Sequence, residues 1–312
     1  MLKTSTMKPF AKGDIFLGCS YLDDPNDDHK GEGRILQFDK NWVPKGTLYT
    51  AGTTYLIVGC NFAPDGTLWA FDSQGHVVVR VAPDGTQLDN WEPGRGFGSV
   101  SWDAEGNLYF GEYFIGHEIW QGTTAKTLPD GRLGEGNIYK YSPDLKLLHT
   151  FAVENAPEFT KFKGVTHSTM HPSKEFITYT TETSRRLMRY DIINDQQLND
   201  LDGYPDADPY DQSDKRWFIA PYYMSDGRLL CTASDGLRIY NEGGEIEQTI
   251  ELPGYGWAQC CPDVDERYAL AANIWNGLAA RIDLQTGRVK QSMDSGFTAP
   301  FRSLAGIAVF AG

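Results

Sequence analysis

The stretch NFAPDGTLWAFDSQGHVVVRVAPDGTQLDNW, residues 61–91, contains the triplet Pro-Asp-Gly twice, at positions 64–66 and 83–85. Each triplet lies between short runs of apolar and β-branched residues. Asp-Gly turns between such runs are typical of antiparallel strands that are joined by tight turns. Together with the residues just before it, the stretch predicts four strands in the order LIVGCNFA, TLWAF, HVVVRVA and TQLDNW.

The same order of strands and turns recurs along the chain. Four further copies begin near Gly98, Val165, Phe218 and Ala258. The N-terminal region supplies three strands without a first one, and SLAGIAVFAG at 303–312 supplies the missing strand. Four-stranded units that repeat about every 40 residues are typical of β-propeller blades. We therefore predict one all-β domain over residues 1–312, a six-bladed β-propeller of four-stranded antiparallel blades, with one blade closed by the N- and C-terminal strands.

Composition limits the partners of the chain. The net charge of −14 and the pI near 4.8 disfavour nucleic acid and anionic membranes as partners. No apolar run is long enough for a signal peptide or a membrane helix. The odd number of cysteines argues against a disulfide framework and favours reduced, mostly buried thiols in a cytoplasmic protein. These are Cys19, Cys60, Cys231, Cys260 and Cys261.

Two segments carry a family resemblance. APDGTLWAFDS and DAEGNLYFGEY resemble blades of the NHL-repeat and senescence-marker-protein/gluconolactonase superfamily. The resemblance covers nearly the whole chain and implies the propeller architecture. It also implies a choice among three functional classes, namely metal-dependent lactonases, strictosidine-synthase-like proteins and non-catalytic interaction domains.

The lactonases of this superfamily hold calcium or zinc with Glu, Asn and Asp residues near the start of several inner strands. Those ligands lie about seven residues before the Asp or Glu of the following turn. The corresponding positions in this chain are Val58, Gly98, Thr166, Ile219 and Ala258. Only Thr166 has a side-chain oxygen of the kind that calcium prefers. We therefore predict no metal or other cofactor, with a divalent metal and a gluconolactonase-like hydrolase as the alternative.

The long insertions predict where function lies. They fall at 19–34, 112–137, 152–165 and 202–217, in connections from second to third strands or between blades. In a propeller these connections share one face, whereas the other connections here are short turns. Loops that are long on one face only indicate a binding face.

Candidate catalytic residues near that face include a histidine on an inner strand. His167 lies between the two acids Glu112 and Glu182, each of which ends a second strand of an adjacent blade. A histidine beside a carboxylate is a suitable general base because its pKa lies near neutrality. We predict His167 as the base and Glu112 or Glu182 as its partner or acid. His117 and Tyr222 are further catalytic candidates, and the four His and Glu residues are an alternative metal set.

Aromatic and cationic residues near the same face predict a binding site for substrate. The aromatic set could form a funnel for a flat or apolar molecule, and the cations could bind a carboxylate or stabilise an oxyanion. These residues are Tyr55, Phe97, Trp120, Trp217, Trp257, Trp275 and Phe301, with Lys163, Arg185 and Arg302.

The predicted function is an enzyme that acts on a small, largely apolar or aromatic molecule by acid–base chemistry. Ester or lactone hydrolysis, or a related lyase or isomerase step, suits the His, Glu, Tyr and Lys residues. A propeller that binds a ligand or a protein without catalysis is the alternative from another class. Blade sequences are specific for architecture and leave the substrate and the oligomeric state open.

Overall fold

The two Pro-Asp-Gly triplets form tight turns between neighbouring strands. Gly66 and Gly85 have φ angles of 84° and 89°, in the left-handed region that glycine enters without steric cost. The Asp65 carboxylate accepts a hydrogen bond of 2.9 Å from the backbone N–H of Thr67. Turn chemistry that is local in sequence therefore fixes the short connections of this sheet.

The computed structural model describes residues 4–23, 31–117, 125–155, 164–181, 185–204, 206, 216–295 and 304–312. These ranges contain no helix, and their strands form six antiparallel sheets and one short hairpin. The sheets are the blades of a six-bladed β-propeller, which confirms the predicted fold class. The described residues of 1–94, 122–126 and 255–312 group into a first compact unit, and those of 95–121 and 127–254 into a second. The prediction of a single domain stays a prediction.

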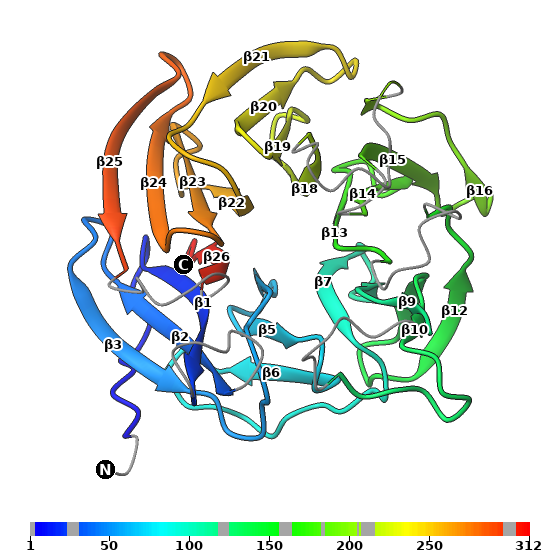
Figure 1. The fold of residues 1–312 in the computed structure, drawn as a ribbon, viewed down its shortest axis with the longest axis horizontal. Helices are drawn as coiled ribbons and strands as arrows, with labels where there is room; N and C mark the ends of the chain where they lie inside the picture. The colour runs from blue at the N-terminus through cyan, green and yellow to red at the C-terminus, as the bar shows by residue number, and fades with distance from the viewer. Residues whose placement is uncertain are drawn as a thin grey trace. The chain divides into compact units, whose positions relative to one another are not determined.

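The first unit contains three of the sheets (Figure 1). One has the order β26-β1-β2-β3, another β4-β5-β6 and the third β22-β23-β24-β25. Their strands are β1 (Ile15–Leu22), β2 (Gly31–Phe38), β3 (Pro44–Tyr49), β4 (Gly59–Phe62), β5 (Leu68–Asp72), β6 (Val77–Val81), β22 (Trp257–Pro262), β23 (Tyr268–Asn273), β24 (Leu278–Asp283), β25 (Arg288–Asp294) and β26 (Leu304–Val309).

Closure of one blade by the two ends of the chain is confirmed. β26 pairs with β1 in antiparallel register, with Ile15 opposite Val309 and Gly18 opposite Gly306. β26 is the first strand of its sheet, and β1, β2 and β3 follow it in sequence order. The N-terminal segment continues this sheet, because Thr6 N donates to the carbonyl of Thr47 in β3 at 2.8 Å.

The fourth strand predicted at residues 86–91 is irregular. It is joined to β6 by isolated bridges between Val81 and Gln87 and between Val78 and Trp91, and Leu88 N donates to the Arg80 carbonyl at 2.8 Å. The polar sequence TQLDNW buries little apolar surface, so side-chain packing adds little to hold it in a regular ladder. The sheet of β4, β5 and β6 is consequently three-stranded with a loosely paired edge.

The second unit also contains three sheets, of order β7-β8-β11-β12, β13-β14-β15-β16 with β17 on β15, and β18-β19-β20-β21 (Figure 1). A hairpin of β9 and β10 lies in the connection from β8 to β11. The strands are β7 (Phe97–Trp102), β8 (Leu108–Glu112), β9 (Ile115–Gly116), β10 (Gly134–Glu135), β11 (Ile138–Tyr141), β12 (Leu147–Phe151), β13 (His167–Met170), β14 (Phe176–Thr180), β15 (Arg186–Asp191), β16 (Gln196–Gln197), β17 (Asp202–Gly203), β18 (Phe218–Tyr223), β19 (Leu229–Ala233), β20 (Gly236–Tyr240) and β21 (Ile246–Glu251).

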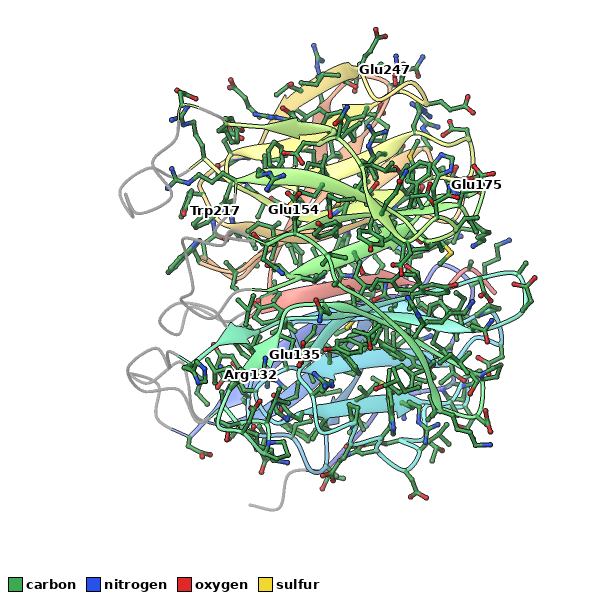
Figure 2. All side chains as sticks on the ribbon, turned by 90° about the vertical axis from the view of Figure 1, so that its right-hand side faces the viewer. Arg132, Glu135, Glu154, Glu175, Trp217 and Glu247 are labelled. Carbon is green, nitrogen blue, oxygen red and sulfur yellow. The ribbon has the colours of Figure 1, made fainter. Side chains whose placement is uncertain are left out.

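Each sheet has two different ends. We call the end at which the second strand leads into the third the long-loop end, and the opposite end the short-turn end. The connection from β8 to β11 spans residues 113–137, whereas the turn from β7 to β8 spans only 103–107. In the second unit, Figure 2 shows Trp217 and Glu175 at opposite ends, which are the long-loop end of β18 and the short-turn end of β14.

A single amide joins the inner strands of the first unit. Gln259 of β22 accepts hydrogen bonds of 2.9 Å from the backbone N–H groups of Cys60 in β4 and Ile307 in β26. Its Nε2 donates to the carbonyl of Cys60 at 2.9 Å. The side chain is 4% exposed. At these points β4 and β26 have no neighbouring strand on their inner edge, so Gln259 supplies the hydrogen-bond partners that their backbone groups need.

The thiol predictions are confirmed, because all five cysteines are buried and none is in a disulfide. Burial raises the pKa of Cys19 to about 11, so this thiol stays protonated at neutral pH. No described helix is long and apolar enough to cross a membrane. The cytoplasmic location stays a prediction.

Candidate functional site

The candidate acid Glu112 is fully buried, with 0% exposure. It ends β8, where its Oε2 accepts hydrogen bonds of 2.8 Å from the backbone N–H groups of Glu135 and Gly136. Tyr139 Oη also donates to Oε2, at 3.1 Å, and Arg95 Nη1 donates to Oε1 at 3.1 Å. The carboxylate therefore fixes the return of the 113–137 connection onto its own sheet.

Glycines allow this return. A Cβ atom on Gly134 would lie 2.4 Å from the carbonyl oxygen of Phe114, and Gly136 has a φ of 70°. A Cβ atom on Gly164 would lie 2.6 Å from the Cα of Gly136. Three backbone segments meet around the Glu112 carboxylate, and only glycine fits where they approach one another.

Arg95 connects Glu112 to a second carboxylate. Its Nη1 lies 3.1 Å from Glu135 Oε2 and 2.7 Å from Tyr139 Oη, and its guanidinium carbon lies 4.5 Å from the centre of the Tyr139 ring. Arg132 Nη2 donates to the other oxygen of Glu135 at 3.0 Å. Arg132 and Glu135 lie next to each other in Figure 2. We call Arg95, Glu112, Arg132, Glu135 and Tyr139 the Glu112 network.

The Glu112 network shifts the pKa of its members. Burial raises the pKa of Glu112, and the charge of Arg95 and the backbone donor at Glu135 oppose that shift. The Tyr139 hydroxyl lowers the pKa of Glu135 against the opposing effect of its partial burial. Burial and the Glu112 charge raise the pKa of Tyr139. At neutral pH the network therefore keeps Tyr139 as a neutral hydroxyl between two carboxylates.

His167 begins β13 and is 4% exposed. It lies opposite Thr180 of β14, and the Thr180 hydroxyl donates to the carbonyl of Ile219 in β18. Directly opposed residues of an antiparallel pair share one face of the sheet. His167 consequently lies on the face of its sheet that points toward β18.

The structure does not bring the His167 imidazole and the Glu112 carboxylate into a hydrogen bond. The residues lie near each other along the backbone, because Val165 N donates to the Glu112 carbonyl at 2.8 Å. The Glu112 side chain is occupied by the 134–139 segment and Arg95. His117 is exposed and forms no hydrogen bond with Glu112. Glu182 lies outside the described residues.

Of the predicted aromatic residues, three lie in sheet cores. Phe97 stacks on Phe110 with ring centres 4.8 Å apart, and Tyr55 and Trp257 are also buried. Trp217 and Trp275 are partly exposed, and Trp275 stacks on Tyr255 at 6.0 Å. Tyr222 of β18 is partly exposed as well. Trp120 and Phe301 lie outside the described residues.

Among the predicted cations, Arg185 is 5% exposed and has a φ of 55°. Its carbonyl accepts a hydrogen bond of 3.1 Å from Tyr204 N, so the strained residue ends the connection from β14 to β15. Lys163 and Arg302 lie outside the described residues. The site assignments as a whole stay predictions.

The sequence interpretation did not single out Arg95 and Tyr139. Arg95 is a cation in the otherwise acidic stretch before β7, and Tyr139 lies three residues after the Gly-Glu-Gly segment 134–136. A second network of similar composition lies in the same unit. Arg238 Nη1 and Tyr240 Oη donate to Asp202 Oδ2 at 2.8 and 2.7 Å. Arginine, carboxylate and tyrosine groups therefore join third strands to loops in more than one sheet.

Metal ligands are not evident in the part of the chain that the structure describes. There, no group of three or more His, Cys, Asp or Glu side chains is placed to hold a metal ion. The five positions that correspond to the lactonase ligands do lie at the starts of inner strands. Gly98, Ile219 and Ala258 are the second residues of β7, β18 and β22, and Val58 and Thr166 immediately precede β4 and β13.

Buried polar side chains gather at the long-loop ends of the sheets. On the sheet that begins with β13, these residues are Thr166, His167, Thr180, Thr181 and Arg185, all at most 5% exposed. The short-turn ends contribute few such residues among those described, chiefly Asp14, Gln37 and Asp283. Buried polar groups cost stability unless they are satisfied, so the long-loop ends are where the described chain places most of this cost.

Comparison with known proteins supports the fold. No protein-family model matches the chain, and no curated protein matches its sequence. A solved chain from a nidogen/laminin complex is 10% identical, with 96% of this chain and 98% of that chain covered and a TM-score of 0.65. A protein of unknown function from Bacteroides caccae is 12% identical, with 97% and 100% covered and a TM-score of 0.60.

A third solved structure is an enzyme. It is a catalytically inactive virginiamycin B lyase from Staphylococcus aureus with quinupristin, 14% identical, with 76% of this chain and 69% of that chain covered and a TM-score of 0.51. At these identities the similarity shows the fold alone. The class of protein is thus a six-bladed β-propeller, and the resemblance to the NHL-repeat and gluconolactonase-like superfamily stays a prediction.

Proposed function

We propose that this protein is an enzyme that acts by acid–base chemistry on a small, largely apolar or aromatic organic molecule. The observation that carries the proposal is the group of buried polar side chains around His167 at the long-loop end of its sheet. The reaction would be hydrolysis of an ester or lactone, or a related elimination or isomerisation. A propeller of similar fold that is named as a lyase supports an enzyme as one possibility for this architecture.

His167 is the proposed general base. A neutral imidazole both accepts and donates a proton, and its ordinary pKa lies near physiological pH. His167 shares its sheet face with Thr180, and that face points toward β18. Trp217 and Tyr222, at either end of β18, are partly exposed. Trp217, at the same long-loop end as His167, offers aromatic surface for a flat substrate, whereas Tyr222 lies toward the short-turn end of β18.

Glu112 has a different proposed role. Its four hydrogen bonds use both carboxylate oxygens, and this supports a positioning function for the 113–137 connection. Catalysis at His167 then depends on a partner other than the Glu112 carboxylate. Glu182, the other acid predicted as a partner for His167, lies outside the described residues and stays a candidate.

The test compares two histidines of one sheet. His167→Gln is compared with His171→Gln, because His171 lies in the short turn after β13, with Nδ1 2.9 Å from Ser173 Oγ. Both variants and the wild type are assayed against phenyl acetate, dihydrocoumarin and quinupristin, with and without EDTA. We expect turnover of at least one compound, a loss of about a hundredfold or more in His167→Gln, and normal rates in His171→Gln. Equal rates in both variants would refute the assignment.

A binding propeller without catalysis is the second candidate. The observation that favours it is the full engagement of the Glu112 carboxylate by the 134–139 segment and Arg95, so that this carboxylate does not assist His167. Under this alternative, compounds bind without turnover and His167→Gln lowers affinity only. Loss of activity on EDTA treatment would instead support the metal-dependent lactonase.

A further inference from the structure

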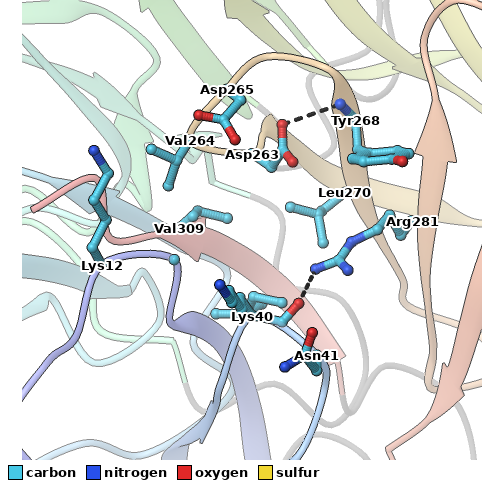
Figure 3. Close-up of a pocket in the computed structure, with 12 residues that line it drawn as sticks. Lys12, Lys40, Asn41, Asp263, Val264, Asp265, Tyr268, Leu270, Arg281 and Val309 are labelled. Atoms are coloured by element: carbon cyan, nitrogen blue, oxygen red, sulfur yellow. Dashed lines mark hydrogen bonds between the residues drawn. The ribbon is translucent and has the colours of Figure 1, made fainter.

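A cavity of about 410 Å³ lies at the short-turn end of the first unit. It is lined by the segment before β1, by the turn between β2 and β3, and by the turn between β22 and β23 (Figure 3). Its volume is within the range of small-molecule sites. The cavity is lined by residues of the first unit, whereas His167 belongs to the second, so the two proposed sites share no residue.

The cavity has an apolar floor and oppositely charged walls. Ile15, Leu270 and Val309 supply the floor. Figure 3 shows Asp263 and Asp265 on one side, with Lys40 and Arg281 on the side facing them. A molecule that fits these walls would carry a negative group and a positive group, with an apolar part that packs on the floor.

Arg281 is held in place with an unused donor. Its Nη2 donates to the backbone carbonyl of Lys40, and its guanidinium carbon lies 5.9 Å from the ring centres of both Trp42 and Tyr268. Its Nε is buried and has no hydrogen-bond partner. Its Nη1 makes no hydrogen bond with a described residue, so it is the donor that a ligand carboxylate would accept from in a charge-assisted bond.

The other charged groups are also available. Lys12 and Lys40 form no ion pair with any described residue, although the protein as a whole is acidic. Asp265 is exposed and makes no hydrogen bond within the described chain. Asp263 is fixed in place, because its Oδ1 accepts the backbone N–H groups of Arg267 and Tyr268 at 3.1 Å.

We infer that this cavity binds a small zwitterion with an apolar body, such as an α-amino acid or a dipeptide. The carboxylate binds Arg281 and Lys40, the ammonium group binds Asp265 and Asp263, and the side chain covers Leu270 and Val309. Lys12 adds positive potential at the cavity rim. This site is independent of the proposed enzymatic function, and its failure would leave that proposal unchanged.

Three probes with one aromatic body test the inference by isothermal titration calorimetry. L-phenylalanine carries both charges, 3-phenylpropionate lacks the ammonium group, and phenethylamine lacks the carboxylate. We expect saturable 1:1 binding of L-phenylalanine, with each single-charge analogue weaker by about tenfold, since each lacks a charge-assisted contact. No saturable binding of L-phenylalanine, or equal affinity for all three probes, would overturn the inference.

Variants locate the binding on the cavity. Arg281→Gln and Asp265→Asn should each weaken L-phenylalanine by about tenfold, and Asp265→Asn should leave 3-phenylpropionate unaffected. Arg288→Gln is the charge-matched control, because Arg288 lies in β25 and does not line the cavity. Thermal unfolding confirms that each variant is folded. If Arg281→Gln is unstable, Asp265→Asn still tests the inference, because Asp265 lies in an exposed turn. The inference would also be overturned if Asp265→Asn bound L-phenylalanine with unchanged affinity, or if Arg288→Gln lost as much affinity as the cavity variants.

Discussion

Replacing Gln259 by leucine removes the amide that joins β4, β22 and β26, while keeping a side chain of similar size. The change leaves three buried backbone groups without their partner: the N–H groups of Cys60 and Ile307 and the carbonyl of Cys60. Each buried group left unsatisfied costs about 1–2 kcal/mol. Water entering the space would satisfy part of this requirement, so we expect a loss of about 3 kcal/mol in the free energy of unfolding.

Urea unfolding followed by tryptophan fluorescence measures this loss, with Gln248→Leu as the control. Gln248 is partly exposed in β21 and makes no side-chain hydrogen bond in the described chain, so its variant should differ from the wild type by less than about 0.5 kcal/mol. A loss in Gln259→Leu as small as that of the control would refute the bridging role.

Gln259→Glu adds a dependence on pH. A protonated carboxyl can accept the two N–H groups and donate to the Cys60 carbonyl, as the amide does, whereas an ionised carboxylate cannot donate. Burial raises the folded pKa of this new group above its unfolded value of about 4.3. Its contribution to stability is therefore fully present below about pH 4 and is lost as the pH rises through the folded pKa. A variant whose stability relative to wild type is the same at pH 4 and pH 7 would contradict this reasoning.

Three further predictions concern other sites. Burial raises the pKa of Glu112, and Arg95 opposes that shift. Ionising Glu112 therefore lowers the stability of the folded protein as the pH rises above the unfolded pKa of this residue. In Arg95→Gln the loss of stability should be larger and extend to higher pH, which urea unfolding midpoints between pH 4 and 8 would measure. In Gly256→Ala the new Cβ would lie 1.5 Å from Trp275 Cδ1, so the indole must move and tryptophan fluorescence should change. Gly94 has a φ of 72° and nothing within 4 Å of an added Cβ, so Gly94→Ala should show backbone strain alone. Because burial raises the pKa of Cys19 to about 11 and also raises that of Cys60 and Cys261, these thiols should react with Ellman's reagent at pH 8 at least about a hundredfold slower in the folded protein than in urea. Rapid labelling of the native protein would contradict this prediction.

The parts of the fold that were predictable depend on local chemistry. The turns at Gly66 and Gly85 require only an aspartate and a glycine in adjacent positions, and alternation of apolar residues predicts the strands between them. The pairing of 304–309 with Ile15–Leu22 is distant in sequence. It was still predictable, because the repeat gives only three strands to the N-terminal blade and leaves one additional strand at the C-terminus.

The Glu112 network could not be predicted in this way. Its members come from the segment before β7, the end of β8 and the 132–139 region, and their approach depends on how a long connection folds back. Neither period nor turn chemistry specifies that path. The irregular pairing of 86–91 was missed for a related reason, since a polar edge segment has little packing to fix its register.

The pairing of β26 with β1 has a consequence for synthesis on the ribosome. β1, β2 and β3 emerge first, yet the strand that covers the inner edge of β1 is made only after about 280 further residues. Through that interval β1 carries unpaired N–H and C=O groups, which are a template for pairing with other chains. Of the six sheets, the one whose strands β1, β2 and β3 come first in the sequence is therefore the last to be completed.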